Sequence, residues 1–300
     1  MTTAKNGSKH GGKTNSGELQ TFVNAREHSA VFIAVSGSLS LSHVVQLQKE
    51  IQGSKYEELD MVVQCGGGDI HAAYQIMELL RLHATKLNAC VPFFATSAAT
   101  LLCIGANTII LDELAQLGPL DTQVEERQRG GKKEFVSALN PFKALEQMQK
   151  FALETLDLSM KMIVGRSGLD VDECFKHGME FVRVTAGPLF SQLNPEKLGA
   201  YSRALSIGEE YAKRLLMRCS NWDEEKRNAV ATRLVHGYPS HDYIIDYREL
   251  QDIGFQVELF KEAERKPAQK LVEYFFKEKD VIRLVDCEKP PEKPKEEQKT

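Results

Sequence analysis

The sequence contains no long hydrophobic run, although 42% of its 300 residues are hydrophobic. No apolar stretch approaches the roughly 18 residues that a membrane-spanning helix needs. Residues 1–20 lack the apolar stretch of a secretory signal peptide, and 1–17 has the polar composition of a flexible tail. We therefore expect a cytoplasmic protein without a membrane span.

Metal and nucleotide motifs are also absent. The six cysteines and eight histidines show no C-x-x-C or H-E-x-x-H spacing, so we expect no metal. Neither G-x-x-x-x-G-K-[ST] nor G-x-G-x-x-G occurs, and no cofactor is expected. A net charge of −4 argues against a general nucleic-acid surface. The scattered cysteines are typical of reduced core residues in a cytosolic protein.

What the sequence does contain is a series of strand–helix units. Residues 30–35 and 60–65 have the apolar pattern of buried strands, whereas 42–51 carries apolar residues at helical spacing. Repeated units of this kind predict an α/β fold with parallel strand pairing. At this length we expect one large domain, or one domain with an added helical part.

The strongest functional signal lies at 91–123. We interpret this stretch as a strand, a sharp turn, a short buried helix and a second strand, with Ser97 at the turn. Such a turn exposes the hydroxyl, and the helix start offers unpaired N–H groups to a developing anion. These properties suit a nucleophile. A lone serine before a helix is more often a simple N-cap, however.

A glycine cluster upstream favours the functional interpretation. Gly66, Gly67 and Gly68 directly follow the strand at 60–65, and Asp69 opens a helix. Glycines between a strand and a helix N-terminus let backbone N–H groups point at an anion. That anion is either a phosphate or the oxyanion of an acyl-transfer intermediate.

The order of these parts resembles the serine dehydrogenase proteinase (SDH) family, relatives of signal peptide peptidase A in the ClpP/crotonase fold. That family combines a Pro-Gly-Gly turn, a helix ending near a His, a V-P strand, S-[GA]-G-T and L-G-P-V-D-P-Q. The matching residues are Gly67, Gly68, His83, Val91, Pro92, Ser97, Thr100, Leu117, Gly118, Pro119, Asp121 and Gln123. The resemblance implies a ClpP/crotonase-like spiral of strand–helix units with an added helical C-terminal part.

A second match lies at 238–245, YPSHDYII, which is similar to the family's T-H-D-Y-P-I stretch. The resemblance is strong over 60–123, fair over 228–257 and weak between these segments. Two residues depart from the family pattern: Gly66 replaces its Pro, and Ala99 replaces the Gly that follows its serine. Neither change removes a reacting group, but both could reshape the oxyanion pocket.

The sequence does not decide which residue is the base that would activate Ser97. ClpP-like relatives have a His where this chain has Thr122, whereas signal peptide peptidase A uses a Lys several dozen residues past its serine. The latter implies Lys143 or Lys150 here, and we prefer Lys143. A lysine base must be buried to be neutral, yet each residue also fits an exposed helical position.

His241, Asp242 and Asp121 are the other candidates. A His–Asp pair orients an imidazole well. Adjacent residues point apart in a strand, so His241 and Asp242 cannot simply form a relay. Asp121 either orients a base or caps a turn.

We divide the chain into the tail 1–17, a Clp/SppA-like serine peptidase domain at 18–260 and a charged C-terminal tail at 261–300. Residues 124–227 form a largely helical insertion in that domain. A strand-like run at 281–285 falls within the charged tail.

Inside the insertion, 125–140 interrupts the strand–helix pattern. Its first part, 125–134, has no apolar face and is interpreted as an exposed loop, either a lid or a solvated segment. A helix is expected to start at Pro141. Further helices are expected at 170–178 and 207–219, with an extended connection at 184–195.

The resemblance and the residues together predict a serine endopeptidase that cleaves peptides or unfolded proteins through an acyl-enzyme on Ser97. Gly67, Gly68 and Ala98 are expected to form its oxyanion hole, and a Ser–Lys dyad is favoured. The apolar face of the helix after Pro141 predicts a homo-oligomer. The alternative is a catalytically impaired member that binds peptides or serves as an oligomeric scaffold. Acyl-CoA chemistry is disfavoured, because crotonase-like sites use Glu acid/bases rather than a serine at this turn.

Overall fold

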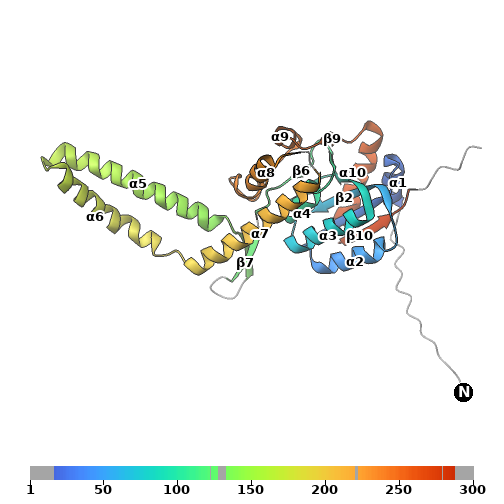
Figure 1. Ribbon diagram of the computed structural model, residues 1–300, viewed down its shortest axis with the longest axis horizontal. Coiled ribbons are helices and arrows are strands. Elements are labelled where there is room, and N and C mark those ends of the chain that lie inside the picture. Colours follow the sequence, from blue (N-terminus) through green and yellow to red (C-terminus); the bar gives the residue numbers. More distant parts are fainter. Residues whose placement is uncertain (1–16, 122, 128–132, 220–221, 279, 288–300) are drawn as a thin grey trace, which may run out of the picture.

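The computed structural model describes residues 17–121, 123–127, 133–219, 222–278 and 280–287 (Figure 1). Its main sheet has the strand order β10-β1-β2-β3-β5-β9, and all of these pairs are parallel except β10 with β1. The short strand β4 pairs in parallel with the last residue of β2, and the short strand β6 pairs in parallel with β4. The strands are β1 Ala30–Val35, β2 Tyr56–Cys65, β3 Ala84–Val91, β4 Phe94–Ala95, β5 Thr108–Leu111, β6 Gln116–Leu117, β9 Val257–Leu259 and β10 Asp280–Val285.

Helices cover both faces of this sheet. The helices are α1 Gly17–Arg26, α2 Leu41–Ile51, α3 Ile70–His83, α4 Ala98–Ile104, α5 Asn140–Ser167, α6 Val171–Phe190, α7 Pro195–Cys219, α8 Glu224–His236, α9 Tyr247–Ile253 and α10 Glu262–Lys277. Alternate strand residues face opposite sides. Ile33 and Val63 therefore join the core under α2, α3 and α4, whereas Phe32 and Val62 join the core under α1 and α10. The predicted α/β fold is confirmed.

The segment assigned to a charged tail begins with two elements of the fold. Strand β10 pairs with β1 and forms one edge of the sheet, and α10 buries Leu271 and Phe275 against the sheet. Arg26 of α1 contacts Asp60 at 2.7 Å and Glu264 of α10 at 2.9 Å, with all three side chains buried. The tail assignment is therefore wrong for 262–285. The amphipathic patch at 271–276 and the strand-like run at 281–285 are recognisable in the sequence, but the charged residues around them led us to assign the whole segment to a tail.

Helices α5 and α6 form an antiparallel hairpin that extends away from the sheet as an arm (Figure 1). We expected a helix to end at Gly178 and an extended segment at 184–195, but α6 is continuous from Val171 to Phe190. Gly178 lies where α6 packs on α5, and a Cβ there would be about 3.2 Å from Leu156. The glycine thus permits close helix packing, and Pro188 is accommodated near the helix end.

The segment expected to be an exposed loop forms an antiparallel hairpin instead. Strands β7 Gln123–Arg127 and β8 Lys133–Ser137 pair in register from Gln123 with Ser137 to Arg127 with Lys133. Residues 128–132, on which the lid hypothesis also depends, lie outside the described residues. Within the described part of the chain, no helix combines the length and apolarity needed to cross a bilayer.

Candidate active site

Ser97 lies at the turn between β4 and α4, where the chain reverses its direction. Its backbone angles are φ 54° and ψ −129°, and Glu27 is the other described non-glycine residue with a positive φ. Such a conformation costs roughly 1–3 kcal/mol and persists where surrounding contacts enforce it. The Ser97 side chain makes no capping hydrogen bond to α4. A simple N-cap role therefore does not explain this serine.

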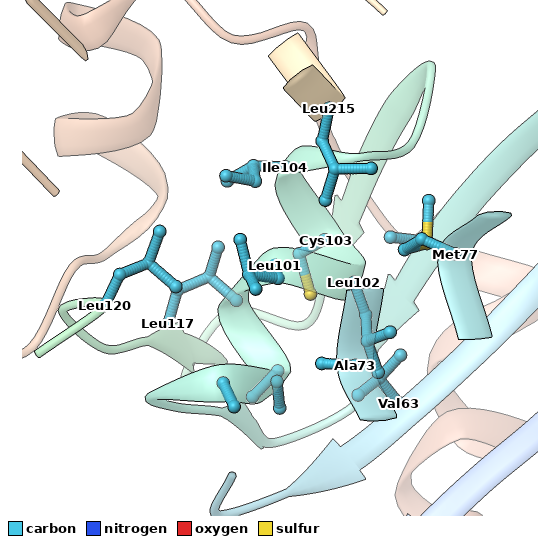
Figure 2. Packing of buried hydrophobic residues seen from close by; sticks show 14 of the residues in the cluster. Val63, Ala73, Met77, Leu101, Leu102, Cys103, Ile104, Leu117, Leu120 and Leu215 are labelled. Atoms are coloured by element: carbon cyan, nitrogen blue, oxygen red, sulfur yellow. The ribbon is translucent and has the colours of Figure 1, made fainter. Parts of the chain in front are cut away.

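Contacts from three segments hold the turn. The Thr96 N–H donates to Cys65 O at 3.0 Å, and Thr100 Oγ1 donates to Gly118 O at 2.7 Å. All residues of α4 are buried, and Figure 2 shows Leu101 facing Leu117 and Leu120. The turn is thus presented by a short helix embedded in the core, which restricts its movement.

The glycine cluster packs directly against Ser97. Gly67 and Gly68 have φ angles of 103° and 139°, which favour glycine. A Cβ on Gly67 would lie 2.7 Å from Ser97 Cβ, and a Cβ on Gly68 would lie 2.3 Å from Leu39 N. Both backbone polar groups of Leu39 are hydrogen-bonded to the glycine segment: its N–H donates to Gly67 O, and its carbonyl accepts from the Asp69 N–H. No other residue type fits these two positions without backbone movement.

We predict that Gly67→Ala destabilises the protein by about 1–3 kcal/mol, because the new methyl group meets Ser97 and the backbone has a positive φ. Urea unfolding measures the change. Gly37→Ala is the matched control, because a Cβ there meets no atom within 4 Å. A Gly67→Ala protein as stable as the control variant would contradict the described packing.

The expected oxyanion donors differ in their availability. The Gly67 N–H donates to Cys65 Sγ at 3.3 Å. In the conformation described this N–H group is therefore already engaged, and its expected role as an oxyanion donor stays a prediction. By contrast, the N–H groups of Gly68 and Ala98 make no hydrogen bond to any described residue. Ala98 directly follows Ser97 and Gly68 lines the same cavity as Ser97, so these two N–H groups are the donors that remain for an anion.

A cavity of about 420 Å³ opens in front of Ser97. Besides Ser97 it is lined by Gly37, Ser38, Asp69 and the three glycines 66–68. Burial raises the pKa of the Cys65 thiol to about 11. Cys65 is therefore a neutral hydrogen-bond partner at pH 7 and not a competing nucleophile. No group of three His, Cys, Asp or Glu side chains suited to a metal occurs among the described residues.

The two lysines favoured as bases lie on the surface of α5. The Lys143 side chain is 47% exposed and lies 3.5 Å from Glu146, and the Lys150 side chain is 66% exposed and lies 3.9 Å from Glu154. The burial that a neutral lysine base requires is absent in the single chain. Both lysines therefore occupy the exposed helical positions that the sequence also allowed, and the role of either as a base stays a prediction.

The structure instead brings Asp121 and His241 together. His241 Nδ1 lies 3.7 Å from Asp121 Oδ2, and the side chains are 17% and 2% exposed. Ser137 Oγ donates to the same carboxylate oxygen and accepts from the Leu139 N–H, while Asp242 is exposed. Neither Asp121 Oδ1 nor His241 Nδ1 has a hydrogen-bond partner among the described residues.

This pair belongs to the neighbourhood of the serine turn. Thr96 touches Gly118 so closely that a Cβ on Gly118 would lie 2.9 Å from Thr96 Cβ. Asp121 follows Gly118 by three residues, which span at most about 11 Å. The segment before Asp121 also bridges to the His241 loop, since Leu117 pairs with Ile245.

Residues 38–164 match the family model of ClpP-like SDH-type serine proteinases, which contains both the glycine cluster and the Ser97 turn. The chain is similar to that family over this segment, which makes up less than half of its length. The uncharacterized protein MJ0137 of Methanocaldococcus jannaschii is 31% identical over 106 residues, 35% of this chain and 37% of MJ0137. The uncharacterized protein MJ1495 of the same organism is 23% identical over 226 residues, 75% of this chain and 59% of MJ1495. The matches thus span about one third and three fifths of these relatives.

Sequence reasoning missed the pairing of Asp121 with His241 and the occupation of the Gly67 N–H by Cys65. The first pairing joins residues distant in the sequence, and the signal for it was the presence of both in family-like motifs. The hydrogen bond between the Gly67 N–H and Cys65 could not be predicted from the sequence, because cysteines are common in buried strands. The SDH-family prediction, by contrast, is confirmed.

Proposed function

We propose that this chain is a serine peptidase that hydrolyses peptide bonds through an acyl-enzyme on Ser97. The observation that carries the proposal is the strained Ser97 backbone beside two unengaged N–H groups, those of Gly68 and Ala98. Strain of this kind concentrates at functional sites, and a serine at a strand–helix turn is a common nucleophile arrangement. Similarity of the 38–164 segment to a serine proteinase family supports the same reaction.

In the proposed reaction Ser97 Oγ attacks the carbonyl carbon of the scissile peptide bond. The carbonyl oxygen becomes an oxyanion and accepts hydrogen bonds from Gly68 N–H and Ala98 N–H. Each such donor is worth on the order of 3 kcal/mol in the transition state. The proton from Ser97 passes to a base and then to the leaving amine, and water hydrolyses the resulting ester by the reverse sequence.

We assign the base to His241, oriented by Asp121, in preference to the Ser–Lys dyad. The buried Asp121 carboxylate lies 3.7 Å from His241 Nδ1 and is held by Ser137. This arrangement would leave Nε2 of the imidazole as the proton acceptor. Lys143 and Lys150 are exposed and paired with glutamates, so a role for either requires that another chain cover it.

A peptide-binding or scaffold protein without catalysis is the second candidate. It is favoured by one observation: no described base makes a hydrogen bond to Ser97 Oγ. Catalytic contacts are often loose without substrate, so this observation alone does not exclude a peptidase. The two functions are separated by incubating the protein with unfolded casein and counting new amino termini. A peptidase generates them and its Ser97→Ala variant does not, whereas a scaffold generates none.

We further propose that the chain forms a cytoplasmic homo-oligomer through the α5–α6 arm, with its active sites in an enclosed space. The arm carries a groove of about 600 Å³ lined by Phe151, Leu158, Met162, Ile163 and Phe181 among others. Four of these side chains are 45–60% exposed, and monomers rarely leave such a patch uncovered. The free cysteines 65, 90, 103 and 174 are compatible with a reducing compartment.

Light scattering tests the assembly. We expect a mass several times that of one chain at micromolar concentration, and dissociation by Leu158→Glu combined with Phe181→Glu, because charges would enter the apolar groove. Leu82→Glu is the control, since Leu82 is 68% exposed on α3 of the sheet body. A monomeric wild-type protein would contradict the proposed assembly.

A further inference from the structure

A second, smaller groove adjoins the Ser97 cavity at the same edge of the sheet. It has a volume of about 220 Å³ and shares Gly37 and Gly66 with the cavity of Ser97. A Cβ on either glycine would meet no atom within 4 Å, so both positions border open space. The two glycines therefore form the shared border of the cavity and the groove. Because they have no side chains, a bound peptide can extend across them from Ser97 into the groove.

Three of the nine residues that line this groove are phenylalanines. Phe94 lies three residues before Ser97, and Phe275 and Phe276 come from the end of α10. Phe276 is 64% exposed and stacks edge-to-face with Phe93, itself 39% exposed, at a ring-centroid distance of 6.0 Å. Exposed aromatic side chains that cluster beside a reactive group are typical of binding surfaces.

The remaining wall contains one buried amide. Gln64 precedes Cys65 in β2, and because strand residues alternate, it faces the groove while Cys65 faces the glycine loop. Gln64 is only 5% exposed, and its Oε1 atom has no hydrogen-bond partner among the described residues. A buried amide without a partner is costly and calls for an explanation. A polar group at the base of an apolar groove is the usual composition of a ligand pocket.

We propose that this groove is a specificity pocket that receives one large apolar side chain of the peptide, next to the bond that Ser97 attacks. The inference rests on the proposed peptidase function and adds its substrate class: unfolded chains with an aromatic or large aliphatic residue flanking the cleaved bond. A cavity of about 150 Å³ admits benzene. The 220 Å³ groove is therefore large enough for a phenyl or leucyl side chain. The Gln64 amide would bind a polar atom of that residue or of the adjacent backbone.

Two variants alter the groove without touching the reacting groups. Phe276→Asp places a carboxylate on the exposed rim of the groove. Gly66→Val places a side chain in the open space between the cavity and the groove, and Gly66 does not have a positive φ that would strain a valine. Leu82→Asp is the matched control, because it makes the same kind of change at a 68% exposed leucine on α3, outside the groove. Unfolding temperatures within a few degrees of wild type verify that the variants fold.

The experiment maps the cleavage sites in unfolded casein by mass spectrometry and compares kcat/KM for two peptides that differ only in Phe or Ala at the mapped position. We expect wild type to prefer Phe at least about tenfold. Gly66→Val should remove most of this preference, and Phe276→Asp should shift cleavage toward Lys, whereas Leu82→Asp changes neither. The rate of Ser97 labelling by a small fluorophosphonate should stay within about twofold in Phe276→Asp and Leu82→Asp.

The outcomes separate the two proposals. If wild type is labelled and cleaves peptides, but Phe276→Asp and Gly66→Val keep its site preference, the pocket assignment is wrong and the peptidase function stands. If wild type is neither labelled nor active, the proposed function itself fails, and the pocket assignment fails with it.

Discussion

Replacing Ser97 with Ala is expected to abolish peptide hydrolysis, with a loss of at least about 10³-fold in kcat. The acyl-enzyme cannot form without the hydroxyl, and the oxyanion donors alone leave only a small residual rate. Stability should change by less than about 1 kcal/mol, because the substitution removes one oxygen atom that makes no capping hydrogen bond. Initial rates on unfolded casein and urea unfolding of the same preparations measure the two effects.

The matched control for this variant is Ser38→Ala. Ser38 lines the same cavity but is exposed and does not lie at a strained turn. It should retain activity within a few-fold of wild type. An active Ser97→Ala protein, or an inactive Ser38→Ala protein, would show that Ser97 is not the nucleophile or not the only serine required.

The second large effect concerns the base. His241→Ala should lower kcat by about 10²–10⁴-fold, the usual contribution of a general acid–base group. Lys143→Ala and Lys150→Ala should each stay within a few-fold of wild type, because both amines are exposed and lie beside glutamates. Single-turnover rates with one peptide substrate compare the three variants directly.

His236→Ala is the control for His241→Ala, since His236 lies 3.2 Å from Glu209 on the surface. It should remain active. Asp121→Asn should lose activity without unfolding, because Asn keeps the shape of the side chain but removes the charge that orients the imidazole. If His241→Ala stays active and one lysine variant is dead, the Ser–Lys dyad replaces the His–Asp assignment.

The nucleophile turn was predictable from local sequence because its chemistry is local. Small residues, a buried strand before Ser97 and a glycine cluster before a helix are features of short segments, and each folds as expected. The φ angles of Gly67 and Gly68 explain why glycine stands there. Even the alternation in β2, which places Cys65 and Gln64 on opposite faces, follows from strand geometry.

The base and the C-terminal elements were harder to predict because they depend on tertiary packing. The position of Lys143 on the exposed side of α5 follows from how Phe142 packs on the body, which the helical pattern alone does not give. Asp121 and His241 lie in two segments that are distant in the sequence and are joined in the fold by the Leu117–Ile245 bridge. In α10 the charged residues are as numerous as the hydrophobic ones, and the helix buries Leu271 and Phe275 in the core.

The central claim, that Ser97 is an activated nucleophile, is tested most directly by its reaction with a fluorophosphonate probe. Intact-mass spectrometry would follow wild type, Ser97→Ala and Ser38→Ala at equal concentration. We predict one adduct per chain on wild type and on Ser38→Ala, mapped by peptide mass to Ser97, and none on Ser97→Ala. An unlabelled wild-type protein, or equal labelling of Ser97→Ala, would contradict this claim.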